Sequence, residues 1–450
     1  MAALALMTAA CSNEDNEITQ QPQNTRGIPF TVTLSMGESA TTRALTPNGN
    51  KIDATWETGD KVALIYTVGE TTYKKDATVT AQTNGTATVS TTLEGSPLDG
   101  STVTIIYPST AADKTTNDYI KTGLLEGQDG TLAGIAAKYD VRKGTGKLSI
   151  SGSAGNETAT VYDDNRTNNL VKLENQYSIF KFSVRDINGE AFIGDMRITE
   201  FKVSDNDGNV KATFTGNIAA SDVYVALPKL TAGKYWFNAS LSDGTLSKPY
   251  IAKATATATT AGKYYPVTVK MATIGDFILS DGTFAAANTT TTTGTPVAMI
   301  TYLGNATGHE DFRHGLALAM NDENSGNGLT WSTAKNTYHN KASNVTDASS
   351  WMLPSETQWT NMDDHVRNYF NTPGLYDLFH DDVHVFHVTG ATNLQYKDTD
   401  NSHILYWSYT SVDDATARAY SVYYTPYWFD DPKANAVNPY KRVCRTCLAF

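Results

Sequence analysis

The run ATVTAQTNGTATVSTTL (residues 77–93) joins two alternating segments through Asn84 and Gly85. In each segment, small or β-branched apolar residues alternate with polar ones, which is the period of a half-buried strand. An Asn-Gly pair between two such segments favours a two-residue hairpin, because both turn positions need a positive φ that these residues tolerate. The run therefore predicts a β-hairpin and, with it, an antiparallel sheet.

Other segments of the first 270 residues have the same character. Turn residues bound each of them, and long amphipathic helices are absent. Many short strands with regular turns are typical of β-sandwiches, and this length favours two in tandem. The polar stretch 155–168 is the expected boundary. The predicted strands are KVALIYT (61–67), STVTIIYP (101–108), YSIFKFSV (177–184), VYVALP (223–228), KYWFNASL (234–241) and KYYPVTVKM (263–271).

The composition changes near residue 272. All eight histidines lie between His309 and His403, and five of the seven tryptophans lie at or beyond Trp331. Residues 273–450 are therefore predicted to form a separate α+β domain. Ser355 and Gln358 form a capping box, and apolar residues at helical spacing follow up to Tyr369. Pro373-Gly374 is expected to end this helix. The strands expected after it are HVFHVTG (384–390), ILYWSYT (404–410), AYSVYYT (419–425) and the final RVCRTCLAF (442–450).

Charge and hydropathy exclude several partners. The chain has 450 residues and a net charge of −12, without a block of lysines and arginines. Nucleic acids and anionic lipid surfaces require clustered positive charge, so neither is an expected partner. No stretch approaches the ~20 apolar residues of a membrane span.

The first residues, MAALALMTAACSNEDNE (1–17), combine a short apolar run, small residues before a cysteine, and an acidic tail. This pattern is typical of the end of a secretory signal. It resembles a bacterial lipobox, which would make Cys11 the acylated first residue of the mature protein. Residues 1–27 are then a signal end and flexible tether, with too little apolar surface to fold. The alternative is a free cysteine near a disordered terminus.

No catalytic or metal site is predicted. In GHEDFRH (308–314), the two histidines are five residues apart, whereas a zinc-protease helix needs four. A loop could gather His380, Asp382 and His384, but surface histidines are the preferred interpretation. KGTGKLS (143–149) lacks the glycine spacing of a phosphate-binding loop. We therefore expect neither an enzyme nor a cofactor.

Cys444 and Cys447 form a lone C-x-x-C. Without a second pair or a nearby histidine they cannot complete a tetrahedral zinc site. A local disulfide or two quiet thiols are the alternatives.

The richest aromatic cluster lies near the C-terminal end. Aromatic faces beside carboxylates suit sugar binding, because ring C–H groups stack and hydroxyls need acceptors. The competing interpretation is core plus a hydrophobic loop. The candidate ligand surface consists of Tyr423, Tyr424, Tyr427, Trp428 and Asp430.

The first 270 residues resemble fimbrillin-type (type V) pilins of anaerobic Gram-negative bacteria. The resemblance rests on TWETGDKVALIY (55–66), EGQDGTLAGIAAKYDV (126–141), ENQYSIFKFSV (174–184), VYVALP and AGKYYPVTVKM (261–271), in this order. It implies two transthyretin-like β-sandwiches, over 28–165 and 166–272. It also implies export as a lipoprotein through Cys11 to the outer membrane and cell surface.

The same resemblance gives a role to ATTRAL (40–45). Pilins of this family are matured by a trypsin-like protease that cuts after an arginine, which points to Arg43, followed by Ala44. The piece removed would include IPFTVTLSM (28–36), itself an alternating strand, and a strand of another subunit would replace it. Arg26 is a competing site, but cutting there would leave that strand in place. An ordinary loop arginine is the other alternative.

Residues 273–450 resemble C-type-lectin-like domains. WMLPSETQW (351–359) fits their helix entry, and YWSYT (406–410) and VCRTCLAF (443–450) fit their last strands. Related formylglycine-generating enzymes depend on cysteines in the domain core that this sequence lacks, so that activity is not carried over. No calcium-type sugar motif is present.

Together, these resemblances predict the tip or an accessory subunit of a fimbria assembled by donor-strand exchange, presenting a lectin-like adhesion domain. The expected partners are other pilin subunits, a trypsin-like protease, and a glycan or protein ligand. The alternative is a cell-surface glycan-binding lipoprotein that never polymerises.

Overall fold

The computed structural model describes residues 27–36, 46–48, 51–53, 55–83, 85–163, 169–287, 294–370, 375, 404–421, 427–433 and 441–450. The chain divides into two compact units. The first unit contains 1–43, 54–122 and 142–174, and the second contains 44–53, 123–141 and 175–450. Each is described by itself below.

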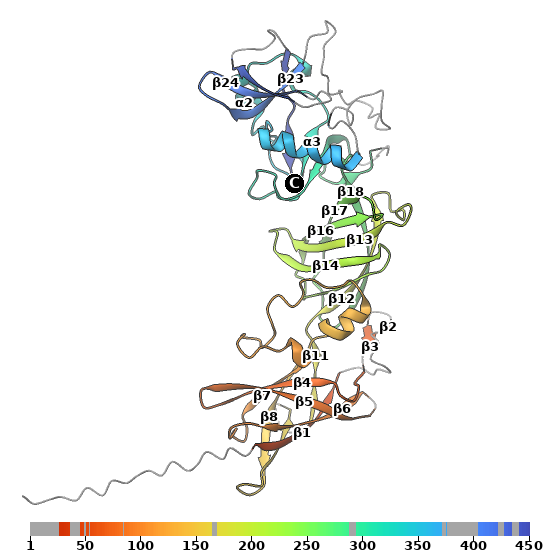
Figure 1. The fold of residues 1–450 in the computed structure, drawn as a ribbon, viewed down its shortest axis with the longest axis vertical. Coiled ribbons are helices and arrows are strands. Elements are labelled where there is room, and N and C mark those ends of the chain that lie inside the picture. The colour runs from red at the N-terminus through yellow and green to blue at the C-terminus, as the bar shows by residue number, and fades with distance from the viewer. Residues whose placement is uncertain are drawn as a thin grey trace, which may run out of the picture. The chain divides into compact units, whose positions relative to one another are not determined.

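The first unit is built on one nine-stranded sheet in the order β10-β1-β6-β5-β4-β7-β8-β11, and β9 pairs with both β1 and β8. Figure 1 shows β1 and β4 to β8 of this sheet. The predicted hairpin is confirmed: β5 and β6 pair antiparallel from Thr83↔Thr86, and Gly85 has φ 80°. A 3-10 turn, η1 (Ser109–Ala111), follows β7. The strands are β1 (Ile28–Ser35), β4 (Lys61–Val68), β5 (Thr71–Thr83), β6 (Thr86–Leu93), β7 (Thr102–Tyr107), β8 (Arg142–Ser151), β9 (Thr158–Tyr162), β10 (Leu170–Lys172) and β11 (Glu174–Asn175).

Two details of this sheet differ from the sequence interpretation. Because β9 bridges β8 and β1, the sheet closes on itself, whereas two separate layers were expected. Strand β10 also pairs with β1, so the first sheet continues beyond the expected limit at residue 165.

The segment KGTGKLS (143–149) lies in β8, where a Cβ at Gly146 would meet the carbonyl oxygen of Tyr162 at 2.4 Å. Its glycines therefore permit close strand approach.

In the second unit, a seven-stranded sheet has the order β14-β13-β16-β17-β18-β12-β15, with β12 and β18 parallel. Its core contains Phe182, Phe201, Phe214 and Phe237. A separate two-stranded sheet consists of β2 (Thr46–Asn48) and β3 (Lys51–Asp53). The sheet strands are β12 (Ser178–Asp186), β13 (Arg197–Asp205), β14 (Val210–Ala219), β15 (Val223–Leu227), β16 (Gly233–Ser242), β17 (Ser247–Ala256) and β18 (Tyr264–Thr273).

The segment 123–141 joins the two outer strands of this sheet. It holds α1 (Leu132–Gly134) and a π-turn, η2 (Ile135–Tyr139). The Gln128 backbone donates to Thr213 of β14, while its fully buried amide donates to and accepts from Ala226 of β15, each at 2.8 Å. A buried amide satisfied on both sides stabilises this closure.

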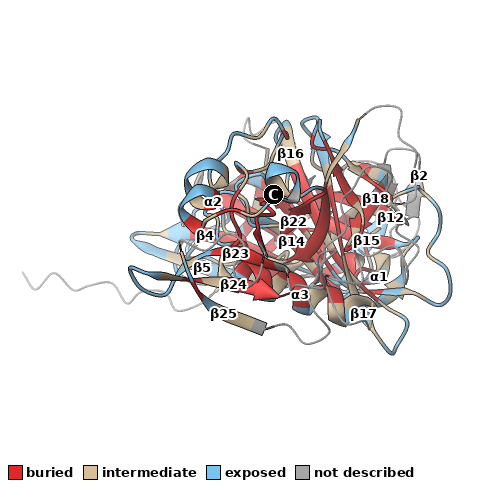
Figure 2. Ribbon diagram, turned by 90° about the horizontal axis from the view of Figure 1, so that it is seen from above, coloured by how far each residue is buried: buried red, intermediate tan, exposed pale blue. Residues whose placement is uncertain are grey.

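The C-terminal part of the second unit contains the sheets β20-β19-β21-β22-β27 and β25-β24-β23-β26. Figure 2 shows β22 as a buried ribbon, and every residue of β22 is buried. In β23, residues 405–408 are buried, whereas Tyr409 is exposed. The elements are β19 (Phe277–Leu279), β20 (Phe284–Ala285), β21 (Pro296–Leu303), β22 (Gly315–Ala319), η3 (Glu323–Gly326), α2 (Trp331–Tyr338), α3 (Glu356–Phe370), β23 (Ile404–Ser411), β24 (Thr416–Ser421), β25 (Tyr427–Pro432), β26 (Lys441–Val443) and β27 (Cys447–Ala449).

The predicted helix is confirmed as α3. The Ser355 amide donates to Gln358 Oε1 at 2.7 Å, and the Gln358 amide donates to Ser355 Oγ at 3.2 Å, so both halves of the capping box form. Trp359, Met362 and Val366 are fully buried on its inner face. The expected helix end at Pro373-Gly374 and the strand at 384–390 lie outside the described residues.

Candidate functional site

Every second side chain of strand β1 is buried in the core of the first unit. Ile28, Phe30, Val32 and Leu34 are buried, and Phe30 is only 1% exposed. The intervening residues are exposed or partly exposed. Along one edge, β1 pairs antiparallel with β6 over its whole length, from Ile28↔Leu93 to Ser35↔Thr86. This alternation is what a replacement strand would have to reproduce.

Within the described residues, the other edge of β1 is only partly paired. It meets β9 at one position, Phe30↔Ala159, and β10 over Thr33–Ser35, in both cases parallel. A hollow of about 340 Å³ lies along this edge. An edge that lacks continuous partners leaves backbone groups available to another strand. The hollow is lined by Pro29, Thr31, Val32, Thr33, Ser151, Thr158, Ala159, Thr160 and Asn169.

The C-terminal end of β1 is held by a buried arginine. Arg142 Nη1 donates to the Met36 carbonyl at 2.6 Å, and the Leu173 amide donates to the Ser35 carbonyl at 2.8 Å. Sequence reasoning missed Arg142, because a single basic residue at the start of a strand carries no recognisable pattern. The processing residues Arg43 and Ala44, the competing Arg26 and the lipidation residue Cys11 lie outside the described residues.

The predicted aromatic ligand surface is only partly described. Tyr423 and Tyr424 lie outside the described residues, and for Tyr427 only the backbone, in β25, is described. The Trp428 ring packs on the core at 4.9 Å from the Tyr420 centroid. Asp430 forms an exposed ion pair with Arg418 at 2.6 Å. The structure thus places Trp428 in core packing and Asp430 in a salt bridge, and the ligand surface as a whole stays a prediction.

The histidine motifs do not form a metal site in the described residues. There, no three His, Cys, Asp or Glu side chains come together. His309 Nδ1 accepts from the Asp311 amide within a turn, whereas His314 stacks on Trp236 with ring centroids 4.0 Å apart. Burial lowers the pKa of His314 to about 4, so the ring is neutral at pH 7. His380, Asp382 and His384 lie outside the described part of the chain.

Cys444 and Cys447 are free, buried thiols, so the possible disulfide is not formed in this structure. Burial raises the pKa of both thiols, which keeps them protonated and unreactive. Between them, the buried Arg445 donates to Asp322 at 2.6 Å. The C-x-x-C therefore spans a tightly packed connection between β26 and β27. Among the described helices, none is long and apolar enough to cross a bilayer.

Neither protein-family models nor curated proteins match this chain. Among solved structures, a "putative cell adhesion protein" from Bacteroides uniformis is 11% identical, with 56% of this chain and 98% of that one covered and a TM-score of 0.29. Another from Bacteroides ovatus is 12% identical, with 55% and 95% covered and a TM-score of 0.30. The tip fimbrial protein Mfa3 from Porphyromonas gingivalis, with a C-terminal truncation, is 10% identical, with 54% and 98% covered and a TM-score of 0.26. Similarities at this level assign neither family nor function, so a proposal must stand on the molecule's own features.

Proposed function

We propose that this chain is a fimbrial subunit that exchanges β1 for a strand of another subunit and presents an adhesion surface on its C-terminal part. The observation that carries the proposal is β1 itself. Its alternate side chains are buried, one edge is continuously paired, and the other edge borders a hollow. Removing such a strand leaves a groove that is specific for one register, because a slip by one residue would place polar side chains inside.

In this proposal, a trypsin-like protease cuts between Arg43 and Ala44. The cut separates β1 from the rest of the first sheet in sequence, so that the strand is then held only by non-covalent contacts. Main-chain hydrogen bonds from a donor strand replace those of β1. Lipidation at Cys11 would carry the precursor to the outer membrane before cleavage.

The C-terminal part is proposed as the lectin-like adhesion module, and the two sheets before it as transthyretin-like pilin domains. A tip or accessory position in the fimbria is part of this proposal, and strand β27 serves within it as a buried part of its own sheet. The expected ligand is a glycan or a protein. A non-polymerising glycan-binding lipoprotein is the alternative that a failure of cleavage at Arg43 or of strand exchange would favour.

Limited trypsin digestion of the folded chain tests the proposal. We expect one early cut after Arg43, identified by mass spectrometry of the new N-terminus at Ala44. The variant Arg43→Gln should lose this cut and keep β1, whereas the matched variant Arg26→Gln should be cut as the parent is. Early cutting only at Arg26, with 27–43 retained, would contradict the proposal.

A further inference from the structure

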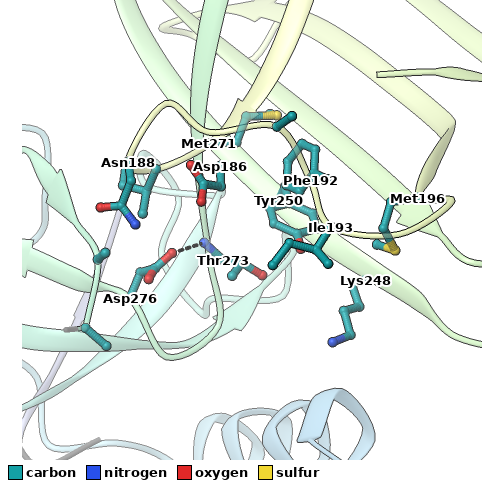
Figure 3. A pocket seen from close by; sticks show the side chains of 14 residues that line it. Asp186, Asn188, Phe192, Ile193, Met196, Lys248, Tyr250, Met271, Thr273 and Asp276 are labelled. Carbon is teal, nitrogen blue, oxygen red and sulfur yellow. Dashed lines mark hydrogen bonds between the residues drawn. The ribbon is translucent and has the colours of Figure 1, made fainter. Parts of the chain in front are cut away.

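A hollow of about 390 Å³ lies within the second unit, between the seven-stranded sheet and the first residues of the C-terminal part. Its size falls in the range of small-molecule sites. Its walls come from the loop between β12 and β13, from β17 and β18, and from residues after β18. Figure 3 shows two carboxylates, Asp186 and Asp276, on one side and an apolar group around Phe192 and Tyr250 on the other.

The apolar side is partly open to solvent. The Phe192 and Tyr250 rings pack edge to face with centroids 5.1 Å apart. Ile193, at the rim, is 95% exposed, and Met196 is partly exposed beside it. A ligand with an apolar body would cover this surface and remove it from water, which is favourable.

The acidic side has two neighbouring carboxylates. Asp186 accepts from the Glu190 amide at 2.7 Å, and Asp276 accepts from the Thr273 amide at 2.8 Å. Burial and the negative charge of Asp186 raise the pKa of Asp276 to about 7, against backbone hydrogen bonds that lower it. Lys248, which also lines the hollow, is not among the causes of this shift, and Figure 3 shows it apart from the two carboxylates. A cation bound here would relieve the repulsion between the two carboxylates.

We propose that the hollow binds an organic ammonium ion with an apolar body. The ammonium group lies toward Asp186 and Asp276, and the apolar body lies against Phe192, Ile193 and Met196. A metal ion fits less well, because calcium takes six to eight oxygen ligands and most of this lining is apolar. The site is independent of strand exchange, since all its residues belong to the second unit.

Binding should depend on the charge of Asp276. The titratable groups near it in the described residues are Asp186 of β12, Tyr250 of β17 and Tyr369 of α3. Lys248 of β17 lines the same hollow at a distance from the two carboxylates. Burial raises the pKa of both tyrosines, so they stay neutral between pH 6 and 8. With a pKa of about 7, the charged fraction of Asp276 rises about tenfold over this interval. An ammonium ion should therefore bind about tenfold more tightly at pH 8 than at pH 6.

The test is a methyl NMR titration of the full chain, labelled at isoleucine and methionine methyls, with 2-phenylethylamine as the probe. We expect saturable shifts at Ile193, Met196 and Met271, with the tenfold pH effect. The uncharged analogue 2-phenylethanol should bind at least tenfold more weakly. Equal binding of the alcohol, no shift at these methyls, or the same shifts with calcium chloride would each overturn the proposal.

Pairs of variants test separately the acidic side and the apolar side of the hollow. Asp276→Asn should abolish the pH effect, whereas Asp207→Asn, at an exposed turn of the same sheet, should preserve it. If Asp276→Asn does not fold, Asp186→Asn replaces it, with binding expected to weaken about tenfold. Ile193→Ser should also weaken binding, and Val210→Ser, another exposed apolar position, should not. Unchanged affinity in both Asp186→Asn and Ile193→Ser contradicts the site.

Discussion

Strands β1 and β27 are both short apolar strands near an end of this chain, and they are held in different ways. Every residue of β27 is buried, and it pairs with β22 along one edge. Along its other edge, Cys447 exchanges two backbone hydrogen bonds with Met352, and Ala449 bonds to Ser349 on both its amide and its carbonyl. Only alternate residues of β1 are buried, and within the described part of the chain its second edge is incompletely paired.

We interpret β27 as a permanent part of its core and β1 as a strand that another strand can replace. A strand bonded on both edges cannot leave without breaking the bonds on each, and β27 is bonded to β22 on one edge and to Met352 and Ser349 on the other. Strand β1 must break one continuous ladder, two short parallel contacts and the hydrogen bond from Arg142. The variants below test how firmly each region is held.

The largest loss of stability is expected from Arg442→Met, just ahead of β27. Arg442 is 1% exposed and donates to Asp431 through two nitrogens, at 2.7 and 2.6 Å. Removing it leaves a buried carboxylate uncompensated, which costs about 3–5 kcal/mol. Urea unfolding followed by fluorine NMR of fluorotryptophan-labelled protein measures the loss. The matched variant Arg418→Met breaks the surface pairs with Asp430 and Glu356 and should cost less than about 1 kcal/mol.

Phe30→Ala in β1 should cost about 3 kcal/mol, at the low end for a buried phenylalanine, because a strand beside a hollow can relax. Trp56 is the tryptophan of the first unit, so its fluorine signal reports this loss separately from the second unit. Thr31→Ala, at the exposed neighbouring position, should change stability by less than about 0.5 kcal/mol. Equal losses for the two variants would show that β1 is not inserted with this register.

Acid should weaken the region around β27 through His314. The His314 amide donates to the Phe450 carbonyl at 2.7 Å, and its ring stacks on Trp236. Its pKa is lowered from 6.5 to about 4, so its contribution to stability is full above pH 6.5 and is lost as the pH falls toward 4. Comparing unfolding at pH 7 and 4.5, the parent should lose more stability than His314→Gln. An equal loss in both would assign acid sensitivity to other groups.

The smallest effect is expected at the α3 cap. Ser355→Ala removes the acceptor for the Gln358 amide and should cost about 1 kcal/mol. Asn336→Ala, at an exposed position of α2, should lie within about 0.5 kcal/mol of the parent. A cost of several kcal/mol for Ser355→Ala would mean that α3 depends on its cap more than on the burial of Trp359.

Local patterns predicted the elements well. The Asn84-Gly85 turn, the β-branched runs and the Ser355 capping box act over a few residues, and the structure has the hairpin, all six strands and the helix start there. Long-range pairing left no such signal. Gln128 joins β14 to β15, and its bonding partner in β15, Ala226, lies 98 residues further along the chain. Arg142 donates a hydrogen bond to Met36, which lies 106 residues before it in the sequence. The sequence likewise did not predict the acidic pair Asp186 and Asp276, because only the fold brings these two residues together.

The most direct test of the account is strand exchange after cleavage. Protein cut after Arg43 is mixed with a labelled peptide of residues 28–36, and incorporation is followed by native mass spectrometry. A peptide with Phe30→Asp serves as the matched control, because it places a charge in the buried position. We predict that the parent peptide enters the cut protein but not the uncut protein, that the Phe30→Asp peptide enters neither, and that the fragment carrying β1 is released. Retention of that fragment without exchange, or equal entry of both peptides, would contradict the claim that β1 is a replaceable strand.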